Sequence, residues 1–227
     1  MSIGFNLSSL TQKKEIALVV NEIFYSIQGE SSRIGLPTIF IRLTGCPLRC
    51  QYCDTEYAFT EGERKNIDSI LNDIKQYSAK YITVTGGEPL AQKACALFLT
   101  KLCNHGYYVS LETSGAITVS NVDKRVKKII DIKTPGSKED DKNNFENLKY
   151  LTKNDEIKFV ICDQSDYFWA KQKIIEKEMT EICEIIFSPV YKSLNPSDLA
   201  NWILEDKLNV RMQLQLHKYL WGNQRGK

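Results

Sequence analysis

Short apolar runs alternate with amphipathic stretches along most of this chain. The runs cover residues 16–25, 38–43, 81–85, 107–111, 128–132, 156–161, 184–187 and 210–216. Their lengths and their content of Val, Ile and aromatic residues are typical of buried strands. The polar residues 1–15 precede the first run and are expected to form a loose lead-in.

The segments between these runs have a different periodicity of apolar residues. Ile67, Ile70, Leu71 and Ile74 follow the i, i+3, i+4, i+7 spacing of an amphipathic helix. Helices are predicted over residues 66–77, 90–104, 144–151, 165–179 and 195–208. The last of these has Asn and then Pro at its start, which suits an N-cap and a first helical position. Residues 60–65 are expected to be a charged link, and residues 134–144 a long surface loop.

Strands that alternate with helices indicate βα units around a parallel sheet. About seven such strands favour an incomplete barrel over a closed barrel of eight units. The predicted fold class is therefore α/β, a partial (β/α) TIM-like barrel. A chain of 227 residues is expected to form one domain over residues 1–227. In such sheets active sites gather at the carboxyl ends of the strands.

Composition and charge indicate the cellular compartment of the protein and the classes of partner that it binds. The net charge of +2 gives no global footprint for nucleic acid, and the basic run 124–128 is expected to be a solvated face. No run of 18 apolar residues is present, so no membrane span is expected, and residues 1–14 lack the apolar region of a secretory signal. Seven cysteines without a paired framework are typical of a reducing cytoplasm. We expect a cytoplasmic protein without nucleic-acid or membrane partners.

Three cysteines lie close together directly after the second apolar run. Cys46, Cys50 and Cys53 have the spacing C-x₃-C-x₂-C. Cysteine is the usual ligand of iron–sulfur centres, so this trio can hold three irons of a [4Fe–4S] cluster. The fourth iron would have no protein ligand and could bind a small molecule.

The trio has two alternative interpretations. A structural zinc site needs four ligands, but the two histidines, His105 and His217, are distant, and the other cysteines form no second pair. A disulfide would leave one of the three cysteines unpaired. The spacing therefore favours the cluster, with zinc as the alternative.

Polar and glycine-rich motifs follow several of the other predicted strands. They are Gly86-Gly87-Glu88, Glu112 to Ser114, Lys133, Ser188-Pro189 and Gln215 to His217. Two adjacent glycines allow backbone amides to approach a ligand. Glu112 and Ser114 suit a pair of hydroxyl groups, and Lys133 suits a carboxylate. Because they stand at strand ends, these motifs are expected to share one pocket with the cysteines.

The cysteine loop, with the aromatic Tyr52 before its last cysteine, resembles the signature of the radical S-adenosylmethionine (SAM) enzymes. Three segments narrow the resemblance to the 7-carboxy-7-deazaguanine synthases. They are Phe24 to Glu30 (FYSIQGE), Cys53 to Thr55 (CDT) and Gln215 to Leu220 (QLHKYL). The resemblance extends from about Val20 to Leu220.

The resemblance implies a carbon–nitrogen lyase of queuosine or 7-deazapurine biosynthesis, with the partial barrel of radical SAM enzymes. Such an enzyme converts 6-carboxy-5,6,7,8-tetrahydropterin to 7-carboxy-7-deazaguanine with loss of ammonia. The reduced cluster cleaves SAM to a 5′-deoxyadenosyl radical, which abstracts hydrogen from C6, and SAM is regenerated. The implied cofactors are a [4Fe–4S] cluster, SAM and Mg²⁺. The implied partners are the pterin, an electron donor such as flavodoxin or ferredoxin, and a second copy in a homodimer.

The resemblance also implies roles for individual residues, with no catalytic side chain beyond the cofactor ligands. Cys46, Cys50 and Cys53 would hold the cluster, and Thr55 would ligate Mg²⁺. SAM contacts are implied for Tyr52, Cys53, Asp54, Gly87, Glu88, Glu112, Ser114, Asp131, Lys133, Ser188, Pro189, Val190 and Tyr191. Substrate contacts are implied for Ile27, Gln28, Gly29, Glu30, Arg42, Thr85 and His217.

The chain departs from the family pattern at four places. Asp131-Ile132-Lys133 stands where the family has Ser-Pro-Lys, and Ser188 stands where it has Gln. Ser31 replaces a Gly after Glu30, and residues 221–227 extend beyond the end of compact members.

Two alternative functions use the same cysteines. A radical SAM activating enzyme, which installs a glycyl radical on a partner protein, shares the trio but needs neither Thr55 nor the 27–30 segment. A non-enzymatic zinc- or cluster-binding module would have a structural or sensing role.

Overall fold

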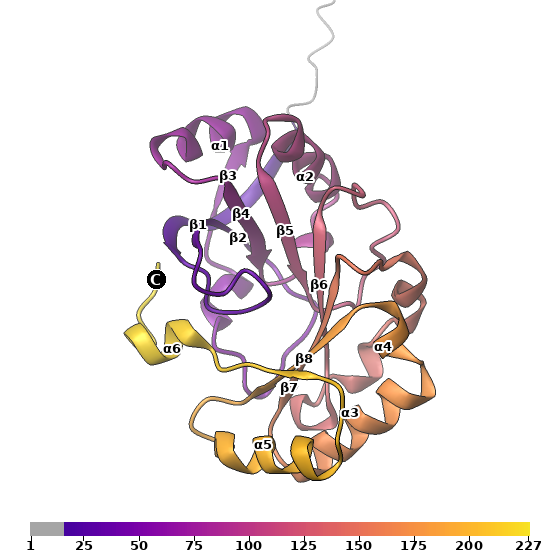
Figure 1. The fold of residues 1–227 in the computed structure, drawn as a ribbon. Coiled ribbons are helices and arrows are strands. Elements are labelled where there is room, and N and C mark those ends of the chain that lie inside the picture. The colour runs from indigo at the N-terminus through magenta and orange to yellow at the C-terminus, as the bar shows by residue number, and fades with distance from the viewer. Residues whose placement is uncertain (1–15) are drawn as a thin grey trace, which may run out of the picture.

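A nine-stranded sheet organises residues 16–227, the part of the chain that the computed structural model describes. The lead-in predicted for residues 1–15 lies outside the described residues. The strand order is β3-β1-β2-β4-β5-β6-β7-β8-β9, and the sheet curves around an interior that stays open between its two edges (Figure 1). This architecture agrees with the predicted incomplete α/β barrel.

Every strand except β3 overlaps an apolar run of the sequence. The strands are β1 Ala17–Ile27, β2 Pro37–Leu43, β3 Glu63–Asn66, β4 Tyr81–Gly86, β5 Tyr108–Thr113, β6 Lys127–Ile132, β7 Glu156–Ile161, β8 Glu184–Pro189 and β9 Arg211–Met212. From β2 through β4 to β9 neighbouring strands are parallel, whereas β1 is antiparallel to both β2 and β3.

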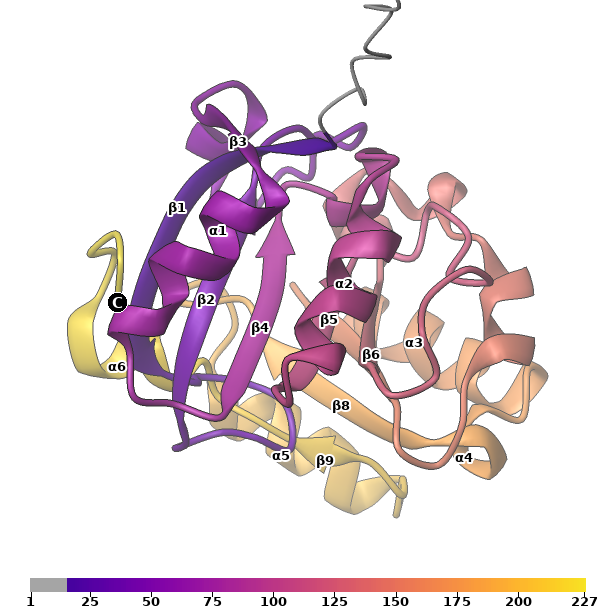
Figure 2. The same cartoon turned by 90° about the horizontal axis from the view of Figure 1, so that it is seen from above.

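The helices, except α6, lie on the outer side of this sheet, where α2 packs on β5, α3 on β7 and α4 on β8 (Figure 2). They are α1 Ile67–Asp73, α2 Cys95–Asn104, α3 Gln164–Glu176, α4 Met179–Ile182, α5 Pro196–Glu205 and α6 Leu216–Trp221. The 3₁₀ turns are η1 Glu56–Phe59, η2 Ile74–Gln76, η3 Pro89–Ala91, η4 Pro135–Ser137, η5 Asp140–Lys142 and η6 Phe145–Tyr150. Asn66 and Asn195 cap α1 and α5, because each side chain accepts a bond from a free amide of the first turn. None of the described helices is long and apolar enough to cross a membrane.

Several sequence-based predictions of local structure are wrong in kind or in extent. The charged link at 60–65 contains β3, which pairs with β1 as an edge strand, and exposed edge strands tolerate charge. The helix predicted at 90–104 starts only at Cys95, after η3. The helix predicted at 165–179 ends at Glu176, and Glu178 then adopts a left-handed φ of 49°. The strand predicted at 210–216 is reduced to β9, and Leu216 begins α6.

The two faces of the sheet differ in polarity because side chains alternate along each strand. Ile39, Ile41 and Val84 point outward and are fully buried beneath the helices. The interior face carries polar residues instead, and the register pairs Arg42 with Thr85. The same alternation turns charged side chains of β6 and β7 toward this interior, where a ligand can reach them.

The open side of the barrel is closed by two segments that lie against each other. Leu216 N donates to the Gly29 carbonyl at 3.0 Å, and Gln213 Nε2 donates to the Ser31 carbonyl at 2.9 Å. Gln215 Nε2 donates to Glu30 Oε1 at 2.7 Å. These bonds join the β1–β2 loop to the start of α6 although β1 and β9 are not neighbours in the sheet. The predicted substrate segment 27–30 therefore forms one wall of the interior.

Candidate active site

A cavity of about 570 Å³ opens at the carboxyl ends of the parallel strands. All but three of the side chains and glycines predicted for the site line it. The exceptions are Glu88, Ser188 and Pro189. The single shared pocket expected from the strand ends is therefore present. The roles of the individual residues stay predictions.

The cysteine loop is tied to its surroundings by backbone hydrogen bonds. Gly45 N donates to the Ala58 carbonyl at 2.8 Å, and Gln51 N donates to the Ser137 carbonyl at 3.0 Å. Cys46, Cys50 and Cys53 carry free, half-buried thiols that all line the cavity. The loop thus presents three thiols to one space.

Burial raises the pKa of each of these three thiols, and that of Cys50 to about 11. They are protonated in the absence of a metal, and ligation would release their protons. Among residues 16–227, no three His, Cys, Asp or Glu side chains converge to hold one metal ion. A structural zinc site takes four ligands, one more than the trio offers. Three thiols suit a cluster in which each thiolate would ligate a different iron.

The turn after β4 packs directly on this loop. A Cβ at Gly87 would collide with the Gly45 carbonyl oxygen, so the glycine is required for the close approach. The amides of Gly87 and Glu88 donate to the Leu43 and Gly45 carbonyls at 3.1 and 2.7 Å. These two amides are therefore occupied by β2 and by the cysteine loop, whereas the SAM contact of Gly87, which lines the cavity, stays a prediction.

The side chain of Glu88 is fully buried behind the cavity. It accepts hydrogen bonds from Leu90 N at 2.9 Å, from Thr113 Oγ1 at 2.8 Å, and from Ser114 N and Oγ at 2.7 and 2.6 Å. It therefore ties the end of β5 to the turn after β4. The predicted SAM contact of Glu88 does not extend to its carboxylate, which positions Ser114 instead.

Ser188 and Pro189 are buried in β8 and do not reach the cavity. The Ser188 hydroxyl has no hydrogen-bond partner among the described residues. The next two residues, Val190 and Tyr191, line the cavity as predicted.

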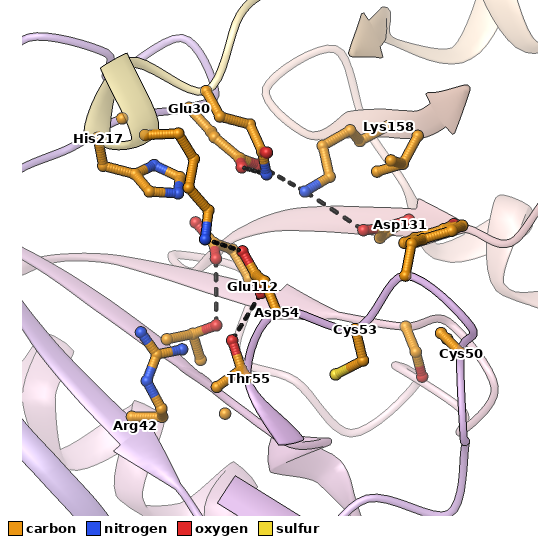
Figure 3. Close-up of a pocket in the computed structure, with 18 of the residues that line it drawn as sticks. Glu30, Arg42, Cys50, Cys53, Asp54, Thr55, Glu112, Asp131, Lys158 and His217 are labelled. Atoms are coloured by element: carbon orange, nitrogen blue, oxygen red, sulfur yellow. Dashed lines mark hydrogen bonds and ion pairs between the residues drawn. The ribbon is translucent and has the colours of Figure 1, made fainter. Parts of the chain in front are cut away.

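A chain of four charged side chains crosses the cavity wall. Figure 3 shows three of them, Glu30, Lys158 and Asp131. Lys158 Nζ lies 2.6 Å from Glu30 Oε2 and 3.2 Å from Asp131 Oδ2, and Lys133 Nζ lies 3.2 Å from Asp131 Oδ1. Burial opposes the charge of Lys158, but the Glu30 and Asp131 carboxylates outweigh it and raise its pKa well above the ordinary value. Sequence reasoning missed Lys158. The available signal was a lysine inside the otherwise apolar run 157–161.

Glu112 lies with the predicted substrate residues and not with Ser114. It accepts hydrogen bonds from Thr85 Oγ1 at 3.1 Å and from Gln28 Nε2 at 3.3 Å. Burial raises its pKa, and the Glu30 carboxylate adds to the shift. Pairing of Glu112 and Ser114 on two hydroxyls was predicted, but the Ser114 hydroxyl donates to Glu88. Glu112 instead offers a buried acceptor to a ligand that carries N–H groups.

Thr55 follows the last cysteine and bonds its neighbour. Its hydroxyl donates to Asp54 Oδ1 at 2.7 Å, and Lys218 Nζ lies 2.9 Å from Asp54 Oδ2. Burial opposes ionisation of Asp54, but Lys218 more than compensates and lowers its pKa to about 2. A hydroxyl that donates one bond keeps lone pairs for another partner. Thr55 can therefore still offer oxygen to a cation.

Arg42 is held from behind by a carboxylate. Its Nε donates to Glu22 Oε1 at 2.7 Å, and the Tyr57 hydroxyl donates to the same oxygen at 2.9 Å. Burial opposes its charge, yet Tyr57 and Glu22 raise the pKa of Arg42 above its ordinary value. The guanidinium is thus a fixed cation in the cavity wall.

His217 packs against Gly29 across the closed side of the barrel. A Cβ at Gly29 would collide with His217 Nδ1, so the glycine allows this contact. Predicted at the end of the last strand, His217 lies in the first turn of α6. Burial lowers its pKa below the ordinary value of 6.5. Farther along the chain, Asn223 and Lys227 also line the cavity, which no sequence pattern indicated.

Comparison with known proteins agrees with these features. The family model described as "Radical SAM superfamily" matches residues 40–135. The 7-carboxy-7-deazaguanine synthase of Chlorobaculum tepidum is 46% identical over 92% of this chain and 96% of its own length. The synthase of Koribacter versatilis is 42% identical over 89% of this chain and 96% of its own. The crystal structure of QueE from Escherichia coli superposes with a TM-score of 0.74 and 22% identity, covering 88% of this chain and 95% of that one.

Proposed function

The chain belongs to the 7-carboxy-7-deazaguanine synthases of the radical SAM superfamily, and we propose from this membership which residues of its cavity bind each cofactor and the substrate. The protein is a radical SAM lyase of queuosine biosynthesis, converting 6-carboxy-5,6,7,8-tetrahydropterin to 7-carboxy-7-deazaguanine. The observation that carries the proposal is that the cysteine trio and the 27–30 segment face one cavity. No observation favours the glycyl-radical alternative.

Cys46, Cys50 and Cys53 would hold the cluster, whose open iron faces the same cavity. When bound, the cluster and SAM together supply the radical that starts the reaction. The protein contributes a closed space, since the Gly29–Leu216 contact shields its open side. Exclusion of water prevents side reactions of a reactive species.

Lys133 is proposed to pair with the carboxylate of SAM. Its ammonium is buried in the wall beside the cysteine loop, and the Asp131 carboxylate keeps it charged against the cost of burial. Tyr52, Val190 and Tyr191 would border the rest of the SAM molecule. In this proposal SAM lies between the cluster and the wall that holds Val190 and Tyr191.

The pterin is proposed to bind between Arg42 and Glu112. A guanidinium forms paired hydrogen bonds with a carboxylate, which suits the 6-carboxyl group of the substrate. Glu112 presents its carboxylate oxygens to the amino-pyrimidine edge of the ring, and Gln28, which donates to Glu112, lines the cavity beside it. A buried carboxyl such as Glu112 gains most from a ligand that donates N–H groups to it.

Thr55 is proposed to ligate Mg²⁺ that also touches the substrate. Mg²⁺ prefers hard oxygen ligands and keeps several waters, so a single hydroxyl from the protein is sufficient. Thr55 lies in the cavity wall, and the ionised Asp54 beside it favours a cation.

For the assembled enzyme we propose a homodimer in the cytoplasm, reduced by a flavodoxin- or ferredoxin-type donor. The support is the family membership alone. Sedimentation velocity distinguishes a dimer from a monomer of 26.0 kDa.

Anaerobic reconstitution followed by turnover tests the proposed function. We expect about four irons per chain and conversion of 6-carboxytetrahydropterin to 7-carboxy-7-deazaguanine with reductant, SAM and Mg²⁺. Cys50→Ala is the control, because two thiolates do not retain a cubane cluster. One stoichiometric zinc with no turnover would instead support a metal-binding module.

A further inference from the structure

The chain of ion pairs along the cavity wall connects the proposed SAM site to the proposed substrate site. We infer that Asp131 and Lys158 couple the two binding events, so that SAM strengthens binding of the pterin. The inference rests on the proposed function, which places the SAM carboxylate at Lys133 and the pterin between Arg42 and Glu112. Glu30, in the 27–30 segment, lines the same cavity. Asp131 and Lys158 would act as positioning residues.

The backbone brings the two central residues together. Asp131 and Lys158 are direct partners in the parallel register of β6 and β7, so both side chains point into the interior. One carboxylate oxygen of Asp131 faces Lys133, and its other oxygen faces Lys158, each at 3.2 Å. Asp131 is therefore shared by two cations.

In this chain of ion pairs, the pair at the Glu30 end has a shorter distance than the central pair. Lys158 lies 2.6 Å from Glu30, compared with 3.2 Å from Asp131. The side chains of Glu30, Lys158, Asp131 and Lys133 are only 11–18% exposed. Charges at such sites are screened far less than surface charges, so a change at one end reaches the next pair.

The sign of the coupling follows from competition for each charge. A ligand carboxylate that binds Lys133 weakens the ion pair between Lys133 and Asp131. Asp131 then draws Lys158 more strongly, and Lys158 holds Glu30 less strongly. Glu30 becomes a better acceptor for N–H groups of the pterin. By thermodynamic linkage, the pterin must strengthen SAM binding by the same factor.

A simpler role for Lys158 is neutralisation of two buried carboxylates without any coupling. The chain offers a matched control for that role outside the cavity. Lys128 and Asp155 form a buried pair at 3.1 Å, with side chains 5% and 2% exposed, and neither lines the cavity. Removing Lys128 leaves a buried carboxylate uncompensated, as removing Lys158 does, but touches neither ligand site.

The experiment measures the dissociation constant of 6-carboxytetrahydropterin by calorimetry, with and without saturating SAM. The cluster is kept oxidised, so that no SAM is consumed. In the wild type we expect SAM to tighten pterin binding roughly tenfold, within the usual range of coupling between sites. In Asp131→Asn the ratio should fall to about one. The pterin affinity without SAM should also fall, because Lys158 then holds Glu30 more strongly.

Further variants separate coupling from neutralisation. Lys158→Arg should keep most of the ratio, Lys158→Met should lose it, and Lys128→Met should lower stability and keep it. An Asp131→Asn variant that retains the wild-type ratio would overturn the inference, even if Lys158→Met does not fold. A wild-type ratio near one also overturns it, while leaving the proposed function intact. Failure of the wild type to bind the pterin at all would overturn the proposed function itself.

Discussion

The guanidinium of Arg225 lies over the ring of Tyr57, with 3.7 Å between Cζ and the ring centroid. It also pairs with Glu61 at 2.9 Å. Tyr57 in turn shares the Glu22 carboxylate with Arg42. The C-terminal segment 221–227 is therefore attached beside the residue proposed to bind the substrate carboxylate.

Arg225→Ala should weaken pterin binding about fivefold and leave SAM binding unchanged. Both partners of the ion pair are about half exposed, so the cation–π contact and the ion pair together contribute only about 1 kcal/mol. Loss of this attachment would free Asn223 and Lys227 from the cavity wall. Calorimetry with each ligand checks the split, and Arg125→Ala is the control, because Arg125 is an exposed arginine paired with Asp123 outside the cavity. Equal effects of both substitutions would contradict a role for the segment.

Glu88→Ala should lower the free energy of unfolding of the whole protein by about 2–5 kcal/mol. Any loss of SAM binding should follow from this loss of stability. The substitution leaves the donors of Leu90, Thr113 and Ser114 unpaired around a buried space. Chemical denaturation of the anaerobic protein measures the loss. A variant of normal stability with weakened SAM binding would show that the carboxylate acts on the ligand.

Thr55→Ala should assemble its cluster and bind SAM nearly as well as the wild type, yet turn over the pterin far more slowly. Loss of one hard-oxygen ligand from Mg²⁺ releases the anchor of the substrate, and misplacement of the reacting hydrogen can cost about 10²-fold. Thr55→Ser keeps the oxygen and should restore much of the rate, whereas Thr55→Val keeps only the shape. The measurement is the magnesium dependence of product formation. An identical magnesium response in all variants would leave Thr55 as a turn residue.

His217 should make the stability of the protein sensitive to mildly acidic pH. Burial lowers its pKa below 6.5, and Lys218 and Lys158 add to the shift while Glu30 and Asp54 oppose it. Below pH 6.5 the unfolded chain binds a proton here more readily than the folded protein does. Its contribution to stability is therefore complete above pH 6.5 and is lost as the pH falls through the lowered pKa.

The check is the free energy of unfolding of the wild type and of His217→Gln between pH 5 and pH 7.5. The difference between the two proteins should change with pH only below about 6.5. His105→Gln is the control, because His105 is exposed and lies outside the cavity. A pH-independent difference for His217→Gln would show that the imidazole titrates at its ordinary value.

Local patterns determined much of this protein. The apolar runs located the parallel strands because each strand has to bury one face under helices, and that requirement is written into neighbouring residues. The C-x₃-C-x₂-C spacing predicted the cluster loop because all three proposed ligands lie within eight consecutive residues. Motifs at strand ends predicted one pocket, because parallel strands end at the same edge of a sheet.

Other features depend on residues that are distant in the chain. The pairing of Asp131 with Lys158 follows from strand register, and the contact of Gly29 with His217 follows from closure of the barrel. Glu88 looked like a ligand residue, but folding turns its carboxylate toward Thr113 and Ser114. No local pattern encodes such contacts. Only the packing of the complete chain decides which polar side chains face the ligand and which satisfy one another.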